Sequence, residues 1–253
     1  MHGRHEAVRQ QAHPLRLDRD QVQAVIDAVE ELSHEGPGDV LALHCDVSQP
    51  EQVDAAAAAV LARFGRVDAL VNNAGVAVFK PVLETTFAEW RQVLSTNLDG
   101  AFLCSHAFGA IMVAQRSGAI VNIASISGLR ASTLRVAYGT SKAALIHLTK
   151  QFAVELGNYG VRTNVICPGP VETEMAKLVH SAAIRADYYD TIPLGRYGST
   201  EEMANTVGFL CSPQASYING QSIAVDGGFD ASGVGLPTLR RTTAELQTVG
   251  QVD

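Results

Sequence analysis

Apolar residues along the chain follow two different spacings, and the change of spacing marks the expected elements. Residues 18–35 place apolar side chains three and four positions apart, which predicts an amphipathic helix. Short apolar runs predict buried strands over residues 40–47, 68–75, 119–125, 161–169 and 221–228. Helices are expected from a capping Ser48 and a helix-opening Pro50, and over residues 86–114, 136–156 and 199–210.

Strands that alternate with helices of this length predict one fold class. Right-handed crossovers would give an α/β, doubly wound, Rossmann-like parallel sheet with helices on both faces. Ligands bind such sheets beyond the carboxyl ends of the strands. Asp46, Asn73, Ser125 and Pro168 each follow an expected strand, so the pattern gathers them at one rim.

Composition narrows the class of protein. A length of 253 residues with 47% hydrophobic content suits one large core, and no Pro/Gly/Ser-rich linker divides it. A net charge of −7 predicts neither a nucleic-acid nor a membrane partner. The cysteines lie apart in apolar runs, which predicts reduced thiols and a cytoplasmic location. The histidines lack ligand spacing, so we expect no metal.

Tyr138 and Lys142 are the residues that most clearly indicate chemistry. A spacing of four puts both on one helix face, where the ammonium would hold the phenol near its anionic form. A phenol with an ordinary pKa of about 10 needs such a neighbour to transfer protons at neutral pH. The alternative is a surface pair with a snorkelling lysine.

Four further motifs accompany this pair: VDALVNNAG (67–75), STNLDGAF (95–102), VNIASISG (121–128) and NVICPGPVETEM (164–175). Together they resemble the short-chain dehydrogenase/reductase family, from about Leu17 to Gly228. The resemblance implies an NAD- or NADP-dependent oxidoreductase that interconverts a small alcohol and its carbonyl compound by hydride transfer. Proteins with this motif set handle sugars, polyols, acyl thioesters and steroids, so the substrate stays open.

The resemblance also implies roles for four catalytic residues. Ser125 would hydrogen-bond the substrate carbonyl, Tyr138 would transfer the proton, and Lys142 would lower the pKa of the tyrosine while binding the nicotinamide ribose. The position of Asn97 would hold a water that links the lysine to solvent. Plain alternatives are a strand-ending cap for Ser125 and a helix kink for Asn97.

A second set of residues would contact the cofactor, again by resemblance. Tyr138 and Lys142 belong to this set as well. Asp46 would meet the adenine amino group, although it could instead be a helix N-terminal acid. The remaining residues are Val47 beside the adenine, Asn73, Ala74 and Gly75 on the adenine-ribose side, and Pro168, Gly169, Val171 and Thr173 near the nicotinamide carboxamide.

Two regions would serve the substrate and the assembly. Residues 174–200 are expected to be the least regular insertion and, by resemblance, a mobile lid. Their apolar content favours an uncharged or amphipathic substrate. Family members are usually tetramers or dimers built on the helices that contain Asn97 and Tyr138, so we expect a homo-oligomer.

One family feature is not found in this sequence. The T-G-x-x-x-G-x-G turn that binds the dinucleotide pyrophosphate is missing, and residues 1–17 offer only the isolated Gly3. We therefore expect an N-terminally truncated domain over residues 18–230, preceded by an atypical segment and followed by a tail at 231–253. The residue that selects NAD or NADP would belong to the missing part.

Three hypotheses follow: an enzyme, a catalytically impaired relic or interaction protein that binds dinucleotide weakly, and a misassigned start. A truncated sheet would expose an apolar edge on the strand over residues 68–75. Residues 40–47 would then either pair with that strand or pack irregularly.

Overall fold

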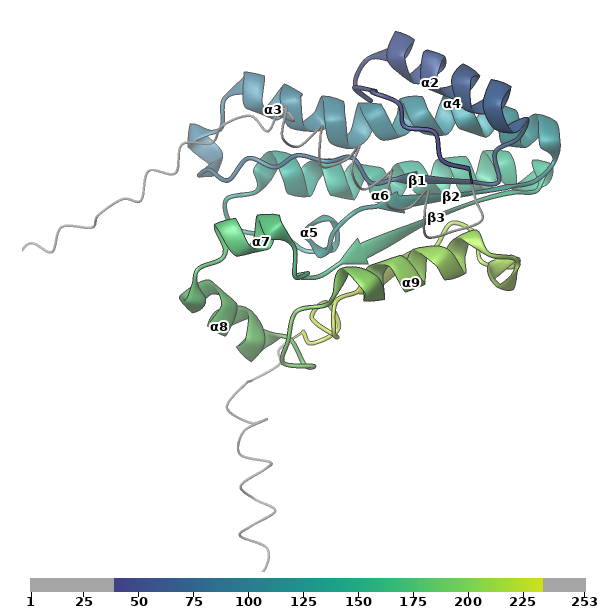
Figure 1. Cartoon of the computed structure of the whole chain (residues 1–253). Helices are drawn as coiled ribbons and strands as arrows, with labels where there is room; N and C mark the ends of the chain where they lie inside the picture. The colour runs from purple at the N-terminus through teal and green to yellow at the C-terminus, as the bar shows by residue number, and fades with distance from the viewer. Residues whose placement is uncertain (1–38, 234–253) are drawn as a thin grey trace, which may run out of the picture.

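The computed structural model describes residues 39–233, which form a parallel sheet covered by helices on both faces (Figure 1). Four strands pair in the order β1-β2-β3-β4, and each pairs in parallel with its neighbours. Their bounds are Ala69–Asn72, Gly118–Ile123, Val161–Pro168 and Ser222–Val225. The predicted α/β architecture is confirmed. The predicted helix over 18–35, the segment 1–17 and nearly all of the tail lie outside the described residues.

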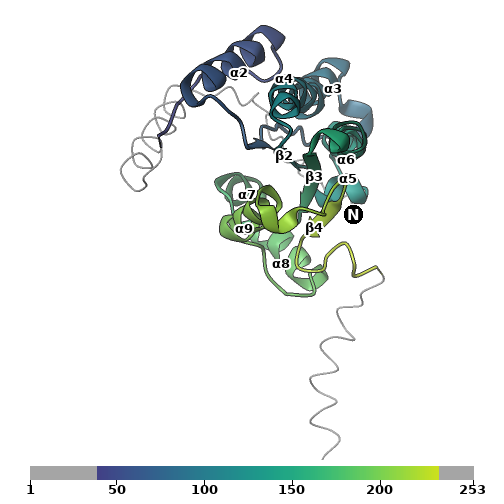
Figure 2. The ribbon, with the colours of Figure 1, turned by 90° about the vertical axis from the view of Figure 1, so that its right-hand side faces the viewer.

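The helices form a layer on each side of the sheet. Helices α4 and α6 lie on one face and α9 lies on the other, with α7 and α8 beyond it (Figure 2). The α-helices are α2 (Pro50–Phe64), α3 (Phe87–Leu94), α4 (Gly100–Gln115), α5 (Ile126–Leu129), α6 (Val136–Leu156), α7 (Glu174–Val179), α8 (Ala182–Thr191) and α9 (Thr200–Cys211). Short turns complete them: η1 (Val82–Glu84), η2 (Ser95–Asp99, a π-helix), η3 (Gly157–Tyr159) and η4 (Pro213–Ala215).

The core is divided between the two faces of the sheet by the alternation of strand side chains. Ile120 packs with Met112 and Val161 on the α4 side, whereas the next residue, Val121, packs with Leu210 beneath α9. Successive strand residues point to opposite faces, so a continuous apolar run supplies both layers. The central strands are therefore packed on both faces, which fixes the positions of the residues that follow them at the carboxyl edge of the sheet.

Hydrogen-bonding side chains mark where the helices begin. Thr86 and Ser199 each form a capping box with the glutamate three residues later, which stabilises the exposed N–H groups of the first turn. The expected capping role of Ser48 is wrong. Gln49 occupies the cap position of α2 and uses no side-chain bond, while the Ser48 hydroxyl bonds Asp46 Oδ1 at 2.7 Å. Pro50 opens the helix as predicted.

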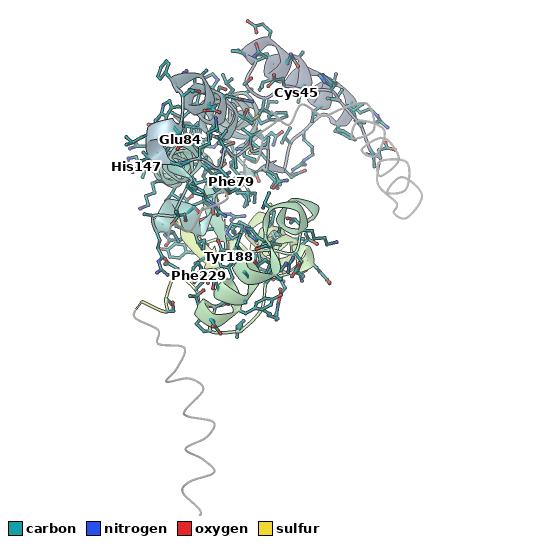
Figure 3. The ribbon with its side chains drawn as sticks, turned by 90° about the vertical axis from the view of Figure 1, so that its left-hand side faces the viewer. Cys45, Phe79, Glu84, His147, Tyr188 and Phe229 are labelled. Carbon is teal, nitrogen blue, oxygen red and sulfur yellow. The ribbon has the colours of Figure 1, made fainter. Side chains whose placement is uncertain are left out.

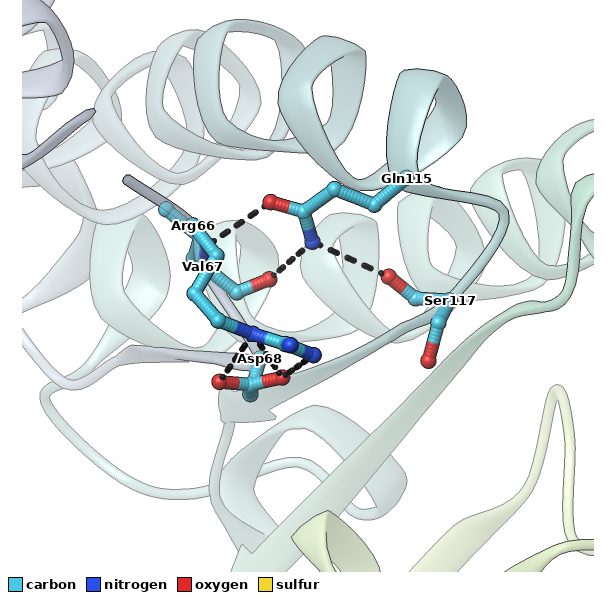
Figure 4. Close-up of polar contacts among 5 residues, drawn as sticks. All are labelled: Arg66, Val67, Asp68, Gln115 and Ser117. Carbon is cyan, nitrogen blue, oxygen red and sulfur yellow. Dashed lines mark hydrogen bonds and ion pairs between the residues drawn. The ribbon is translucent and has the colours of Figure 1, made fainter. Parts of the chain in front are cut away.

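A glutamine at the end of α4 aligns the first two strands (Figure 4). Gln115 accepts from the Val67 N–H at 2.8 Å and donates to the Val67 carbonyl at 2.7 Å and the Ser117 carbonyl at 3.4 Å. One amide side chain thus bonds the backbone before β1 and the backbone before β2. The partner strands begin in register from this end.

Residues 40–47 do not form the expected strand. They run as coil and turn, which agrees with the alternative that they pack irregularly. Within residues 39–233 no strand pairs with the outer edge of β1, and a strand needs a paired neighbour to be stable. Val71 on β1 is 41% exposed, and Val40, Leu41 and Leu43 are exposed too. Within the described residues the outer edge of β1 is therefore unpaired, as expected.

The insertion over residues 174–200 is more regular than expected. It holds the helices α7 and α8, begun by side-chain caps from Thr173 and Ser181. Local capping decides this, because each hydroxyl accepts the N–H three residues later.

One helical stretch in the described part of the chain is long and apolar enough to cross a membrane. It is Phe87–Gln115, with a mean hydropathy of 1.2. In this fold it packs against β1, β2, β3, α2 and α6, as a core helix does.

Candidate active site

The centre of the site is formed by the end of β2, the short helix α5 and the first turn of α6. Ser125 is the N-cap of α5, and its hydroxyl accepts from the Ser127 N–H at 3.1 Å. The Ser125 side chain lies close enough to the phenol of Tyr138 on α6 to lower the pKa of that tyrosine. Lys142 lies one turn further, with Nζ 5.7 Å from the centre of the Tyr138 ring. The predicted trio is therefore brought together.

A glycine contact sets the distance between α5 and α6. A Cβ on Gly128 would lie 2.7 Å from the carbonyl carbon of Lys142 and 2.8 Å from the Ala143 nitrogen. Only a residue without a side chain lets the two backbones approach so closely. Ser125, which begins α5, is thereby held against the tyrosine.

Burial is the largest cause of the pKa shifts of Tyr138 and Lys142. It raises the pKa of Tyr138 above its usual value, while the Ser125 side chain and the charge of Arg135 act in the opposite direction. Burial also lowers the pKa of Lys142 to about 8. The expectation that Lys142 lowers the tyrosine pKa stays a prediction, because Lys142 is not among the causes of the shift in this structure. Its ammonium donates to the Ile123 carbonyl at 2.7 Å and not to the phenol.

Asn97 lies in the π-helical turn η2, between α3 and α4. Its side chain accepts from the Val76 N–H at 2.8 Å and donates to the Val76 carbonyl at 2.9 Å and the Ser141 hydroxyl at 3.0 Å. The kink considered above is confirmed, and it accommodates a side chain that joins the loop after β1 to α6. A water held at this position stays a prediction.

The last residue of β1 and the loop after it differ in exposure, because Asn72 is half-buried and the next three residues are exposed. Asn72 is tied into the core by Nδ2, which donates to Asn122 Oδ1 at 2.7 Å and Ser105 Oγ at 2.9 Å. Asn73, Ala74 and Gly75 are exposed at the rim. A Cβ on Gly75 would come within 3.5 Å of both Lys142 Nζ and Asn97 Oδ1.

Asp46 and Val47 lie just before α2, and no strand precedes them within the described residues. Asp46 Oδ1 accepts from the Ser48 N–H at 3.0 Å, and the Asp46 N–H donates to Gln52 Oε1 at 2.8 Å. Val47 packs so closely on Gly100 that a Cβ there would lie 2.6 Å from Val47 Cγ2. Asp46 thus forms a turn at the start of a helix, and the adenine contacts stay predictions.

The segment after β3 continues the rim on the far side of the tyrosine. Gly169 donates to the Val225 carbonyl at 3.0 Å, and Val171 forms an isolated parallel bridge with Gly198. The Thr173 hydroxyl caps α7 through the Ala176 N–H. Pro168 ends β3, so the four residues form the turn between the sheet and the insertion. Their nicotinamide contacts stay predictions.

A cavity of about 440 Å³ opens in front of the N-terminal end of α6, where Arg135 is one of its lining residues, and no sequence motif indicated its walls. They come from the loop after β1, the residues before α6 and the insertion. Figure 3 shows Phe79 and Tyr188 on one side of the molecule, with Phe229 next to Tyr188. The lining residues are Phe79, Thr133, Leu134, Arg135, Val179, His180, Ile184, Asp187, Tyr188 and Thr191. For Arg135, the signal available in the sequence is its position three residues before Tyr138.

An aromatic cluster supports the floor of this cavity. His180 Nδ1 bonds the Tyr197 hydroxyl at 3.0 Å, and the Tyr188 ring lies 5.3 Å from the His180 ring. Burial, followed by the charges of Arg135 and Arg185, lowers the pKa of His180, so the ring is neutral at pH 7. No group of three possible metal ligands occurs within residues 39–233.

Comparison with known proteins identifies the family. Residues 6–230 match the family described as Enoyl-(Acyl carrier protein) reductase. The chain is 38% identical over 192 residues to the 3-oxoacyl-[acyl-carrier-protein] reductase of Synechocystis sp.. The matched region covers 76% of this chain and 76% of that reductase. The chain belongs to the short-chain dehydrogenase/reductase family.

Two solved structures are similar to it. One is a gluconate 5-dehydrogenase from Burkholderia cenocepacia in complex with NADP and tartrate, with a TM-score of 0.78 and 32% identity, covering 85% of this chain and 84% of that one. The other is an NAD⁺-bound xylitol dehydrogenase, with a TM-score of 0.77 and 30% identity, covering 82% of this chain and 85% of that one. The cofactor of this oxidoreductase family is thus NAD or NADP.

The site residues fit one half of such a cofactor. Lys142 is 4% exposed, and among the described residues the Ile123 carbonyl is the one acceptor bonded to Nζ. Two of its three N–H donors are left for hydroxyls, in the space that a Cβ at Gly75 would fill. Tyr138, Lys142 and the residues Pro168, Gly169, Val171 and Thr173 would hold the nicotinamide ribose half, with Asn73–Gly75 on the adenine-ribose side. The sequence has no glycine-rich turn for the pyrophosphate.

Proposed function

We propose that this protein is an NAD(P)-dependent oxidoreductase that interconverts a small alcohol and its carbonyl compound, with Tyr138 as general acid and base. The observation that supports this is the convergence of the Ser125 hydroxyl and the Tyr138 phenol beside the buried ammonium of Lys142. A hydroxyl and a phenol that both donate to the oxygen of a substrate carbonyl can polarise that carbonyl, and the phenol can transfer a proton to its oxygen.

The roles of the side chains follow from their contacts. In reduction, Tyr138 donates its proton to the carbonyl oxygen while Ser125 donates a hydrogen bond to the same oxygen. In oxidation, the phenolate accepts the proton of the alcohol. The nicotinamide, when bound, supplies or accepts the hydride. Lys142 is mostly charged at pH 7, since its pKa is about 8, and it provides positive charge within 5.7 Å of the ring.

The cavity favours a small substrate. Its volume of about 440 Å³ lies in the range of ordinary ligand sites, and Phe79, Leu134, Val179 and Ile184 give it apolar walls. The α7–α8 insertion forms one wall, which suits a segment that encloses the substrate and excludes water.

The decisive experiment measures reduction of NAD⁺ and of NADP⁺ by a panel of polyols, hydroxy acids and secondary alcohols. Tyr138→Phe should lower kcat by roughly 10²–10⁴-fold, the usual contribution of general acid–base catalysis, and leave cofactor affinity nearly unchanged. Tyr217→Phe is the matched control, because Tyr217 is fully exposed. Normal turnover in Tyr138→Phe would overturn the assignment.

Cofactor affinity tests the hypothesis of an impaired relic. Calorimetric titration of the chain with NAD(H) and NADP(H) should detect binding at millimolar concentration or below. The lack of a glycine-rich turn weakens this affinity, because each charge-assisted hydrogen bond to a phosphate contributes about 1.5–3 kcal/mol. No binding of either dinucleotide would contradict the proposed activity.

We also propose self-association through the outer faces of α4 and α6. Phe102 on α4 is 44% exposed and Val154 on α6 is 77% exposed, and Phe102 lies edge-on to Phe152 of α6. A contiguous apolar surface on two neighbouring helices is typical of an interface between copies. Light scattering should give the mass of a dimer or tetramer, and Val154→Glu should reduce it.

A further inference from the structure

We infer that Arg135 is a specificity-determining residue that binds the carboxylate of a small hydroxy or oxo acid in the cavity that it lines. This inference deepens the proposed function and rests on it. It names a substrate class, namely acids that carry an alcohol or carbonyl group a few bonds from a carboxylate.

The position of Arg135 is the first observation. It is the residue before α6 and lies three residues before Tyr138, a separation that places side chains about 5–6 Å apart at their Cβ atoms. Its guanidinium lines the 440 Å³ cavity. The charge of Arg135 also acts on the Tyr138 phenol, so a carboxylate bound to the guanidinium would hold a small ligand near the catalytic tyrosine.

The guanidinium is also unpaired and preorganised. Its carbon lies 5.0 Å from the centre of the Phe79 ring, so an aromatic face supports the planar group. Within residues 39–233 no carboxylate forms an ion pair with it, in contrast to Arg63, Arg66, Arg91, Arg185 and Arg196. A guanidinium fork matches a carboxylate through two parallel hydrogen bonds.

Other charges in the cavity agree with this orientation. His180 is neutral at pH 7 and adds no second cation. Asp187 supplies a carboxylate, but the charges that shift the pKa values of Tyr138 and His180 include Arg135 and do not include Asp187. Among the lining residues, Arg135 is thus the one cation, beside the neutral ring of His180 and the carboxylate of Asp187.

Equilibrium titration with a matched pair of ligands tests the inference. Gluconate and glucitol share six carbons and differ in the carboxylate, and each is titrated into the full chain with and without NADP⁺. The unmodified protein should bind gluconate at least tenfold more tightly than glucitol. Arg135→Gln should abolish that preference and leave glucitol affinity within about twofold, while Arg135→Lys, which keeps the charge and loses the fork, should retain part of it.

The control is Arg130→Gln, which makes the same change in net charge five residues away. Arg130 already donates to the Phe229 carbonyl and stacks on the Phe229 ring, so the variant should keep the gluconate preference. Equal affinity for the two ligands in the unmodified protein, or an unchanged preference in Arg135→Gln, would overturn the inference. Failure of the proposed function is read separately, as the lack of NAD(P)H formation with every alcohol tested.

Discussion

Lys142 Nζ donates a hydrogen bond to the carbonyl oxygen of Ile123 at 2.7 Å, which ties a buried ammonium on α6 to the last residue of β2. The bond fixes the lysine at the rim of the sheet. Holding the ammonium there removes its charge from water. This burial lowers the pKa of Lys142 to about 8.

The lowered pKa predicts a pH-dependent contribution to stability. Between about pH 8 and 10 the unfolded lysine, with its ordinary pKa of 10.5, binds more protons than the folded one, so the free energy of unfolding gains a term that rises with pH. Relative to Lys142→Met, the unmodified protein should gain stability from pH 8 to 10 in urea titrations. Lys150→Met, at an exposed position of the same helix, should show no such trend.

The contact of Ser125 with Tyr138 predicts a shift in the pH profile of oxidation. Oxidation needs the phenolate, and the Ser125 side chain lowers the tyrosine pKa against the effect of burial. Ser125→Ala should therefore move the limb of kcat/KM that rises with pH to higher pH and reduce kcat. Ser125→Thr keeps the hydroxyl and should restore part of the profile. A profile in Ser125→Ala that coincides with that of the unmodified protein would contradict the assigned contact.

The approach of α5 to α6 predicts a sensitive glycine. Gly128→Ala would place a Cβ 2.7 Å from the backbone of Lys142, so the helices must separate, at a cost of about 1–3 kcal/mol and with loss of activity. Gly208→Ala on α9 meets nothing within 4 Å and should stabilise the protein by about 0.5–1 kcal/mol. Thermal unfolding and initial rates distinguish the two. Full activity in Gly128→Ala would show that the contact does not position Ser125.

The hydrogen bonds of Asn97 predict that removing its side chain destabilises the fold. Asn97→Ala leaves the N–H and carbonyl of Val76 without their partner, which should destabilise the protein by about 2–5 kcal/mol. Asn205→Ala, at an exposed helix position, should change stability by less than about 0.5 kcal/mol. Equal midpoints for both variants in chemical denaturation would refute the role of Asn97 in joining the β1 loop to α6.

The sequence predicted the helices well where their bounds depend on residues only a few positions apart. The bounds of α6 agree with the prediction, and the helices after Thr86 and Ser199 begin at capping boxes that the sequence contains. Residues 40–47 were mispredicted for a different reason. An apolar run forms a strand only beside a partner strand, and the described sheet offers none beyond β1.

The sequence by itself determined the order of strands and helices, the pairing of Tyr138 with Lys142 on one helix face, and the family motifs, because periodicity and spacing act over a few residues. Only the tertiary structure decided what surrounds them. Ile123, rather than the phenol, accepts from Lys142 Nζ, burial raises the pKa of Tyr138, and Arg135 joins Phe79 in one cavity. These contacts bring together segments far apart in the chain, and burial and charge depend on that packing.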